Sequence, residues 1–305
     1  MDMKPTLTVA ELKAACEAGT ALCIIDTLPP EYCEQQHIPG AFNACVYEMA
    51  FLDKVAQLVN DPLTRIVVYG SSERSQGAAV ALEKLSRAGY TNVSELVGGL
   101  EAWQAAGFPV EPEGPGAVEP AGCTDGGYGI DVSNSRLEWT GRNINGRHHG
   151  SINIAGGQVT IALGALTSGM VTLDMNTIVN LDLKDPAYSG MLVSHLKSED
   201  FFDVAAHPTA IFSLNGSEAV DGAVAGSPNV SVKGTLELKG TTKPLSFPAE
   251  IVPQADGTIK VRASFDIDRT RWGVLYGSGR FFEKLGMHLV SDIISIELFL
   301  LARRG

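Results

Sequence analysis

The chain has 305 residues, which is long for one ordinary domain and suits two. With 45% hydrophobic and 19% charged residues, both halves can bury a core. The formal net charge of -12 disfavours nucleic acid or an anionic membrane surface as a partner.

The first 111 residues alternate between helical segments and short apolar strands. Thr8 followed by Glu11 is the pattern of a capping box, so a helix is expected in TVAELKAACEAG. Leu22–Ile25 and Ile66–Tyr69 are apolar runs of the kind found in buried parallel strands. Ser75–Ala88 carries its apolar residues on one helical face. This alternation predicts an α/β domain with a mostly parallel sheet over residues 1–111.

Residues 112–127 separate this pattern from the next one. They are rich in Pro, Gly and acidic residues and contain little that a core could bury. Such a composition is typical of an extended, solvated linker. We therefore predict a linker over 112–127 and a second domain over 128–305.

The second domain is dominated by strands with a period of two. Val230–Lys239 alternates apolar and polar residues, and an Asp256-Gly257 turn leads into another alternating segment, IKVRASFDI. Val290–Leu300 gives the last strand, and YSGMLVSHLKSEDFFDVAAHP is the one helical interruption. Long strands with one apolar face each must pair as a sandwich or close as a barrel, and periodicity leaves both open.

Three segments of the first domain resemble the rhodanese family. They are IDTLPPEYCEQQHIPGAFN, IVVYGSSERSQGAAVALEKLSRAGY and ELVGGLEAWQAAGFPV, and the resemblance covers residues 5–111. It implies a sulfurtransferase scaffold whose catalytic cysteine follows a strand at the start of a helix, where N–H groups and the helix dipole stabilise a persulfide anion.

This sequence has no cysteine at that position. Gly70 stands where the resemblance places the cysteine, so we predict no catalytic residue and an inactive, degenerate loop. Two alternatives stay open: Cys33 or Cys45 supplies the thiol of a sulfurtransferase or thiol-redox enzyme, or the loop binds an oxyanion at the helix N-terminus. The loop consists of Gly70, Ser71, Ser72, Glu73, Arg74 and Ser75.

Four segments of the second domain resemble the YceI family of polyisoprenoid-binding proteins. They are YGIDVSNSRLEW, HLKSEDFFDVAAHPTAIFSL, VKGTLELKGTTKPLSF and IDRTRWGVLYGSG, within residues 128–302. The resemblance implies an all-β, antiparallel, lipocalin-like barrel with a short helix, enclosing a long apolar ligand. A closed eight-stranded barrel has room for one small ligand when its own side chains leave the interior unfilled.

Aromatic residues are the candidate lining of such a barrel, and a basic segment is the candidate head-group site. Arg142, Arg147 and His148 are expected to meet a phosphate or carboxylate at the barrel mouth, the alternative being a solvated basic loop. The candidate lining residues are Trp139, Phe201, Phe202, Phe212, Phe247, Phe265, Trp272, Tyr276 and Phe281.

The remaining expectations concern partners and location. The adjacent residues His148 and His149 would point to opposite faces of a strand, and no cysteine pair has zinc-site spacing, so neither a metal nor a cofactor is expected. No segment reads as a secretory signal or a membrane span, and the five cysteines suit a reducing compartment, so we expect a cytoplasmic protein without membrane insertion. We predict a carrier of an apolar or amphipathic small molecule; a pair of protein-interaction modules, including a homodimer, is the other class considered.

Overall fold

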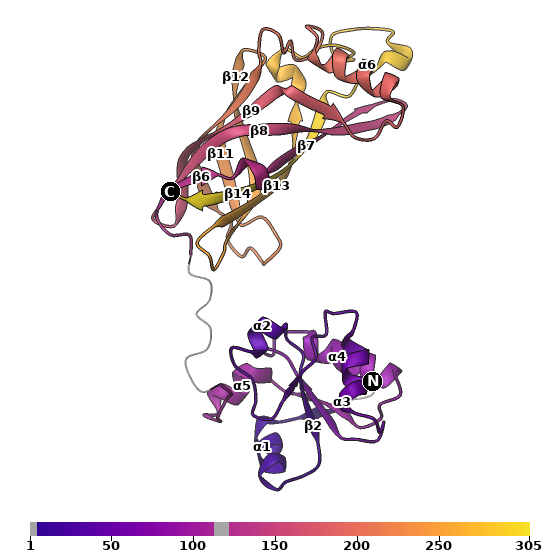
Figure 1. The fold of residues 1–305 in the computed structure, drawn as a ribbon, viewed down its shortest axis with the longest axis vertical. Helices are drawn as coiled ribbons and strands as arrows, with labels where there is room; N and C mark the ends of the chain where they lie inside the picture. Colours follow the sequence, from indigo (N-terminus) through magenta and orange to yellow (C-terminus); the bar gives the residue numbers. More distant parts are fainter. Residues whose placement is uncertain (1–4, 113–121) are drawn as a thin grey trace. The chain divides into compact units, whose positions relative to one another are not determined.

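The computed structural model describes residues 5–112 and 122–305 (Figure 1). The chain divides into two compact units, Met1–Glu119 and Pro120–Gly305. The predicted linker lies mostly outside the described residues, and its last two residues belong to a strand that begins at Gly126. Among the described residues, no helix is both long and apolar enough to cross a membrane.

The first domain is an α/β sandwich around a parallel five-stranded sheet, which confirms the predicted fold class. The strand order is β1-β5-β4-β2-β3, and every pairing is parallel. The strands are β1 (Thr6–Leu7), β2 (Cys23–Asp26), β3 (Phe42–Asn43), β4 (Ile66–Tyr69) and β5 (Val93–Leu96). The helices are α1 (Val9–Glu17), α2 (Pro30–Cys33), α3 (Phe51–Leu58), α4 (Gly77–Arg87) and α5 (Gly99–Ala105).

Both faces of this sheet are buried. Val68 points into the cluster that contains Val55 of α3 and Leu85 of α4. Its neighbour Val67 points into the opposite cluster, with Trp103 of α5. Because successive strand residues face opposite sides, a strand covered on both faces must be apolar throughout, as the run Ile66–Tyr69 is.

The start of α1 confirms the predicted capping box. The Glu11 backbone N–H donates to Thr8 Oγ1 at 3.3 Å, and the Thr8 backbone N–H donates to Glu11 Oε2 at 2.8 Å. Each side chain thus satisfies a backbone donor that the first helical turn leaves free.

The second domain is an antiparallel sheet that closes on itself, so the barrel predicted from the resemblance is confirmed. The sheet order is β13-β12-β11-β10-β9-β8-β6-β14-β7, and β13 also pairs with β14. The strands are β6 (Gly126–Ile130), β7 (Arg136–Asn143), β8 (Gly146–Ala162), β9 (Ala165–Asn180), β10 (Thr209–Ala219), β11 (Val230–Leu238), β12 (Thr241–Pro253), β13 (Ile259–Asp268) and β14 (Ile293–Arg304).

Strands β6 and β7 together fill one position of the barrel wall. Both pair with β8 and with β14, β6 at one end and β7 at the other, with the 3-10 turn Val132–Asn134 between them. The barrel therefore has eight strand positions, the size at which the interior has room for its own side chains or for one small ligand.

One end of the barrel carries the remaining helical elements. The helix α6 (Pro186–Lys197) follows β9, and Figure 1 shows it across the upper end of the barrel. Asp185 caps α6 by accepting a hydrogen bond from the Ala187 N–H at 2.8 Å, and Pro186 occupies the first helical position. The 3-10 turns η2 (Arg269–Trp272) and η3 (Gly286–His288) lie in the long β13–β14 connection.

Candidate ligand-binding site

A cavity of about 410 Å³ occupies the interior of the barrel. Every strand from β6 to β14 contributes to its wall through inward-facing side chains, most of them aliphatic or aromatic. This volume lies within the range of pockets that hold small molecules. The aliphatic lining residues include Leu137, Ile152, Met175, Ile178, Val232, Leu245, Val261, Ile296 and Leu300.

A row of three phenylalanines crosses the middle of the cavity wall. The Phe247 and Phe265 rings stack with centroids 4.1 Å apart, and Phe212 is tilted against Phe247 at 5.4 Å. The Phe212 ring also lies over Gly234 of the neighbouring strand, where a Cβ atom would come within 2.5 Å of it. The missing side chain thus lets the ring lie against the wall rather than project into the cavity.

A second aromatic group stands at the α6 end of the barrel. The His195 ring packs edge-on against Phe201 and Tyr276, at centroid distances of 5.0 and 4.6 Å. All three line the cavity. This cluster connects α6 to the β13–β14 connection across the end of the cavity.

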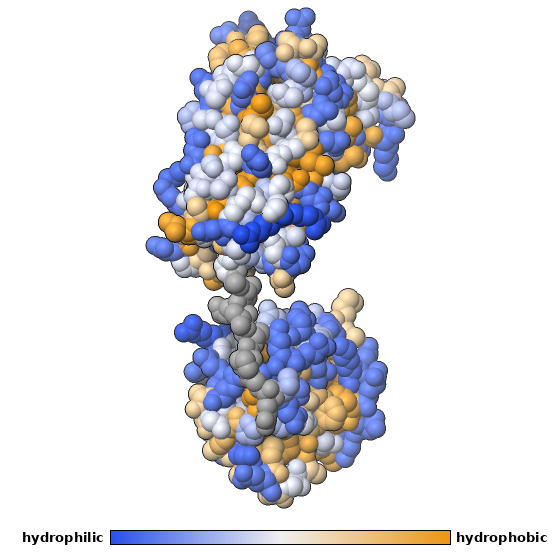
Figure 2. Space-filling view, turned by 60° about the vertical axis from the view of Figure 1, so that its left-hand side comes forward, coloured by the Kyte–Doolittle hydropathy of each residue, from blue (hydrophilic) through white to orange (hydrophobic). Residues whose placement is uncertain are grey.

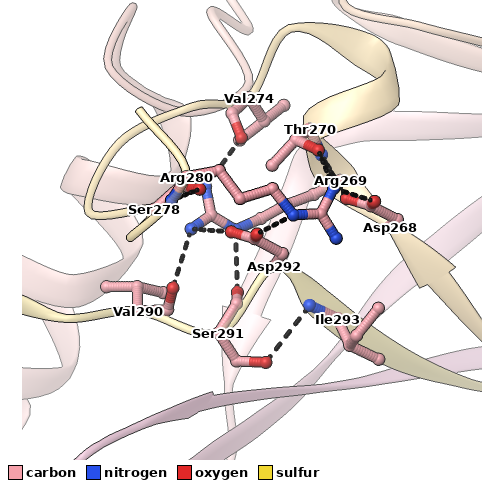
Figure 3. A network of polar contacts seen from close by, with 10 residues as sticks. All are labelled: Asp268, Arg269, Thr270, Val274, Ser278, Arg280, Val290, Ser291, Asp292 and Ile293. Atoms are coloured by element: carbon pink, nitrogen blue, oxygen red, sulfur yellow. Dashed lines mark hydrogen bonds and ion pairs between the residues drawn. The ribbon is translucent and has the colours of Figure 1, made fainter. Parts of the chain in front are cut away.

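The buried cation Arg269 lines the cavity and lies over the Phe201 ring of this cluster, 5.7 Å from its centroid. Figure 3 shows its polar contacts. Its guanidinium donates to the backbone carbonyl oxygens of Val274, Ser291 and Val290, at 2.7, 2.9 and 3.1 Å. Burial lowers the pKa of Arg269, and the Asp292 carboxylate, 3.7 Å away, counters that shift. The residue thus joins both ends of the 274–292 segment and keeps one charge at the cavity wall.

The β7–β8 hairpin supplies the other polar groups of this end. His148 lines the cavity and its Nδ1 donates to Asp182 Oδ2 at 2.9 Å. Burial alone would raise the pKa of Asp182, but hydrogen bonds from the His149 N–H, the His148 ring and Asn180 hold it at about 2. Asp182 is therefore ionised at neutral pH beside two histidines.

The structure places most of the predicted lining residues at the cavity. Seven of the nine line it: Trp139, Phe201, Phe202, Phe212, Phe247, Phe265 and Tyr276.

Trp272 and Phe281 lie elsewhere, which corrects their predicted position. Trp272 is fully buried in η2, outside the cavity lining, and its indole N–H donates to the Leu236 carbonyl oxygen at 2.8 Å. Phe281 stands in a surface turn and is 53% exposed.

The three predicted head-group residues are divided between two sides of the wall. His148 lines the cavity, whereas Arg147 is exposed and is not part of the lining. Arg142 borders the cavity, but it pairs directly with Arg147 across the hairpin and its guanidinium donates to Ser295 Oγ at 2.9 Å, so its charge lies on the outer face. Adjacent strand residues face opposite sides, so an inward His148 places Arg147 outside. Sequence reasoning missed Arg269, because a buried arginine has no signature that distinguishes it from a surface one.

In the first domain, the degenerate loop after β4 is tied to α5. The N–H groups of Leu100 and Glu101 donate to the carbonyl oxygens of Gly70 and Ser71, both at 2.9 Å. Gly99 makes this approach feasible: its φ is +59°, and a Cβ there would lie 2.3 Å from the Gly70 oxygen.

Ser75 fills the inside of the same loop. Its Oγ accepts a hydrogen bond from the Gly77 N–H at 3.3 Å and lies 3.2 Å from where a Cβ on Gly70 would be. A hydroxyl therefore occupies the space toward which a side chain at position 70 would point. Ser71, Glu73 and Arg74 are exposed.

Cys33 and Cys45 are both buried, 6% and 3% exposed. Burial and the adjacent Asp26 carboxyl group raise the pKa of the Cys33 thiol to about 12. Asp26 is itself fully buried at the end of β2, accepts a hydrogen bond from the Tyr69 hydroxyl at 2.7 Å, and has its pKa raised by burial. A thiolate is the form that attacks sulfur, so Cys33 is held in the unreactive form at neutral pH.

Comparisons with known proteins find two families in this chain. A YceI-like domain matches residues 128–302 and a rhodanese-like domain matches residues 8–106. An HTH-type transcriptional regulator of Mycobacterium tuberculosis is 34% identical over 109 residues, 36% of this chain; the chain spans less than half, 46%, of that relative.

Two solved structures are similar to one domain each. A polyisoprenoid binding domain from Saccharophagus degradans is 16% identical, covers 58% of this chain and 98% of its own, and has a TM-score of 0.44. The rhodanese-like domain of an Anabaena sp. protein is 30% identical, covers 38% of this chain and 89% of its own, and has a TM-score of 0.33. With its second domain matched almost from end to end, the chain belongs to the YceI-like family and carries a rhodanese-like domain before the barrel.

Proposed function

We propose that the barrel holds an amphipathic, lipid-like molecule with its apolar part in the cavity. The observation that carries this proposal is a space of about 410 Å³ enclosed by aliphatic and aromatic side chains from every strand. An apolar chain placed there gains roughly 25 cal/mol for each Å² removed from water. The family resemblance implies a polyisoprenoid as one such molecule.

The polar lining residues gather at one end of the cavity, which favours one orientation of the ligand. His148, His195 and Arg269 line the cavity at the α6 end, while the opposite end is lined by residues such as Ile259 and Ala302. A polar head group would lie at the α6 end, with the tail directed toward β6.

The rhodanese-like domain serves recognition or assembly in this proposal, rather than sulfur transfer. Gly70 supplies no nucleophile, and the two alternative thiols, Cys33 and Cys45, are buried. Large side chains stand exposed on segments that follow the carboxyl ends of β2 and β3: Tyr32 is 55% and Tyr47 67% exposed. In a parallel sheet these segments gather at one edge, where binding surfaces commonly lie.

Titration with cis-parinaric acid, a fluorescent apolar probe, tests the barrel's role. Ala210 lines the cavity, and its neighbour Ile211 does not. Ala210→Phe should fill the cavity and weaken probe binding by about tenfold, whereas the matched Ile211→Phe should bind as the wild type does. Equal binding by both variants, or no binding by the wild type, would contradict the proposal.

A further inference from the structure

The cavity reaches the surface at the α6 end, where four segments meet. Asn143 of the β7–β8 hairpin forms an isolated antiparallel β-bridge with Val290. The Leu181 N–H donates to the His149 carbonyl oxygen at 2.9 Å. The His195 and Tyr276 rings join α6 to the same end. Two further lining residues at this end, Met287 and His288, are exposed to solvent, so they form part of the cavity opening.

Large apolar side chains stand exposed around this opening. We call six of them the rim; each is at least 53% exposed. On the face drawn in Figure 2, hydrophobic and hydrophilic side chains are intermixed at the upper end of the barrel domain. Among the described barrel residues, the other large apolar side chains that are more than half exposed are Leu163 and Val224, in connections at the opposite end. The rim consists of Ile144, Leu181, Tyr188, Met191, Phe281 and Met287.

The three segments that carry the rim residues have a combined charge opposite in sign to that of the chain. Segments 142–149, 180–191 and 279–289 hold five basic residues and three acidic ones, a net charge of +2 with neutral histidines, in a chain of net charge -12. Arg147, Lys184 and Lys284 are exposed and have no ion-pair partner within the part of the chain that the structure describes. Exposed apolar groups beside unpaired cations fit the interface of an anionic bilayer.

We propose that the rim docks on an anionic lipid bilayer, so that an apolar ligand passes between bilayer and cavity without crossing water. This inference rests on the proposed ligand-binding function. The opening and the apolar rim share one end of the barrel, so contact there would place the cavity mouth against the hydrocarbon. The overall negative charge opposes binding by other faces and thereby orients the molecule on the bilayer.

Vesicle sedimentation of the full chain tests this docking surface. The probes are vesicles of phosphatidylcholine alone and of an equal mixture with phosphatidylglycerol. The wild type should sediment with the mixed vesicles and much less with the neutral ones. The triple variant Met191→Ser, Phe281→Ser, Met287→Ser should lower the partition coefficient about tenfold or more, since burying one such side chain is worth roughly that factor.

Matched controls separate the rim from exposed apolar residues in general. Leu163→Ser with Val224→Ser removes similarly exposed side chains from the opposite end and should leave vesicle binding unchanged. Lys184→Glu with Lys284→Glu should abolish the preference for mixed vesicles, while Lys260→Glu, at the far end of β13, should not. All these residues are exposed, so unchanged melting temperatures confirm that the variants fold.

The outcomes distinguish docking from ligand binding. Wild-type protein that binds parinaric acid but no vesicle overturns the docking surface and leaves the cavity function intact. Vesicle binding that requires the rim, in a protein that binds no parinaric acid, supports docking while the proposed function fails. A dimer that is lost in the triple variant, without vesicle binding, overturns the proposal by showing that a second copy covers the rim.

Discussion

Gly234 shows how one missing side chain shapes the cavity. A Cβ at this position would lie 2.3 Å from the Ser213 carbonyl oxygen and 2.5 Å from the Phe212 ring, so strand and ring both pack directly on the glycine. A glycine inside a strand normally weakens it, and an aromatic ring across the neighbouring strand offsets that loss.

We therefore expect Gly234→Ala to push Phe212 toward the cavity and to reduce the free energy of unfolding by about 2 kcal/mol. Gly156→Ala is the control, because a Cβ on Gly156 would meet nothing within 4 Å. Its effect should stay within about 0.5 kcal/mol. Denaturant unfolding measures the stability of both variants. Equal stabilities would show that the structure accommodates a Cβ at Gly234 without loss of stability, which contradicts the prediction.

The lowered pKa of Asp182 predicts how the stability of the fold depends on pH. Its pKa in the folded protein is about 2, below the usual value of about 4 for an unfolded aspartate. Such a group stabilises the fold at pH values above about 4, and its contribution is lost as the pH falls toward about 2. The carboxyl group is partly exposed, so solvent screening keeps the effect modest.

Thermal unfolding of Asp182→Asn should show this dependence. The variant should melt below the wild type by about 2–4 °C above pH 4, and the difference should shrink as the pH approaches about 2. Asp221→Asn, in an exposed connection, is the control and should show no such trend. A wild-type advantage that stays constant down to pH 2 would assign the stabilisation to something other than the Asp182 charge.

That a residue is aromatic predicted only in part whether it lines the cavity. The aromatic candidates include Trp272, whose indole N–H reaches the Leu236 carbonyl oxygen from a 3-10 turn, and Phe281, which lies on a surface turn. Both belong to the long β13–β14 connection, where no strand period indicates which side faces inward. On the strands, where the period is two, inward residues such as Phe247 and Phe265 could be predicted.

At the scale of elements, local patterns predicted the strands, and pairing decided the architecture. The strand expected at Val230–Lys239 is β11, and the Asp256-Gly257 turn does connect β12 to β13. Periodicity could not choose between a sandwich and a barrel, because closure depends on the pairing of β13 with β14 and on two short strands sharing one position. The helix was expected from Tyr188, whereas Asp185 and Pro186 already form its start.

The β4–α4 loop leads to a prediction about sulfur chemistry. It contains no thiol, the carbonyl groups of Gly70 and Ser71 accept hydrogen bonds from α5, and the alternative thiols of Cys33 and Cys45 are buried. In a thiosulfate:cyanide assay we expect the wild type and a Cys33→Ser, Cys45→Ser variant to show the same background rate. A wild-type rate clearly above that of the variant would establish a non-standard cysteine and contradict the inactive role proposed for this domain.

At the scale of the whole molecule, an α/β domain and a barrel domain follow from the change in periodicity along the chain. The cavity does not follow from it. A filled barrel and a hollow one present the same alternation of apolar residues, and only the distances across the interior distinguish them. The net charge is equally uninformative about local surfaces, since the three segments that carry the rim have a combined charge of +2 in an acidic chain.

The most direct test of the central claim is native mass spectrometry of the full chain purified from cells, followed by organic extraction and lipid identification. We predict a stoichiometric adduct of an apolar or amphipathic molecule, reduced in Ala210→Phe and retained in Ile211→Phe. A mass equal to that of the chain alone, with no lipid in the extract, would contradict a carrier role and favour two protein-interaction modules instead.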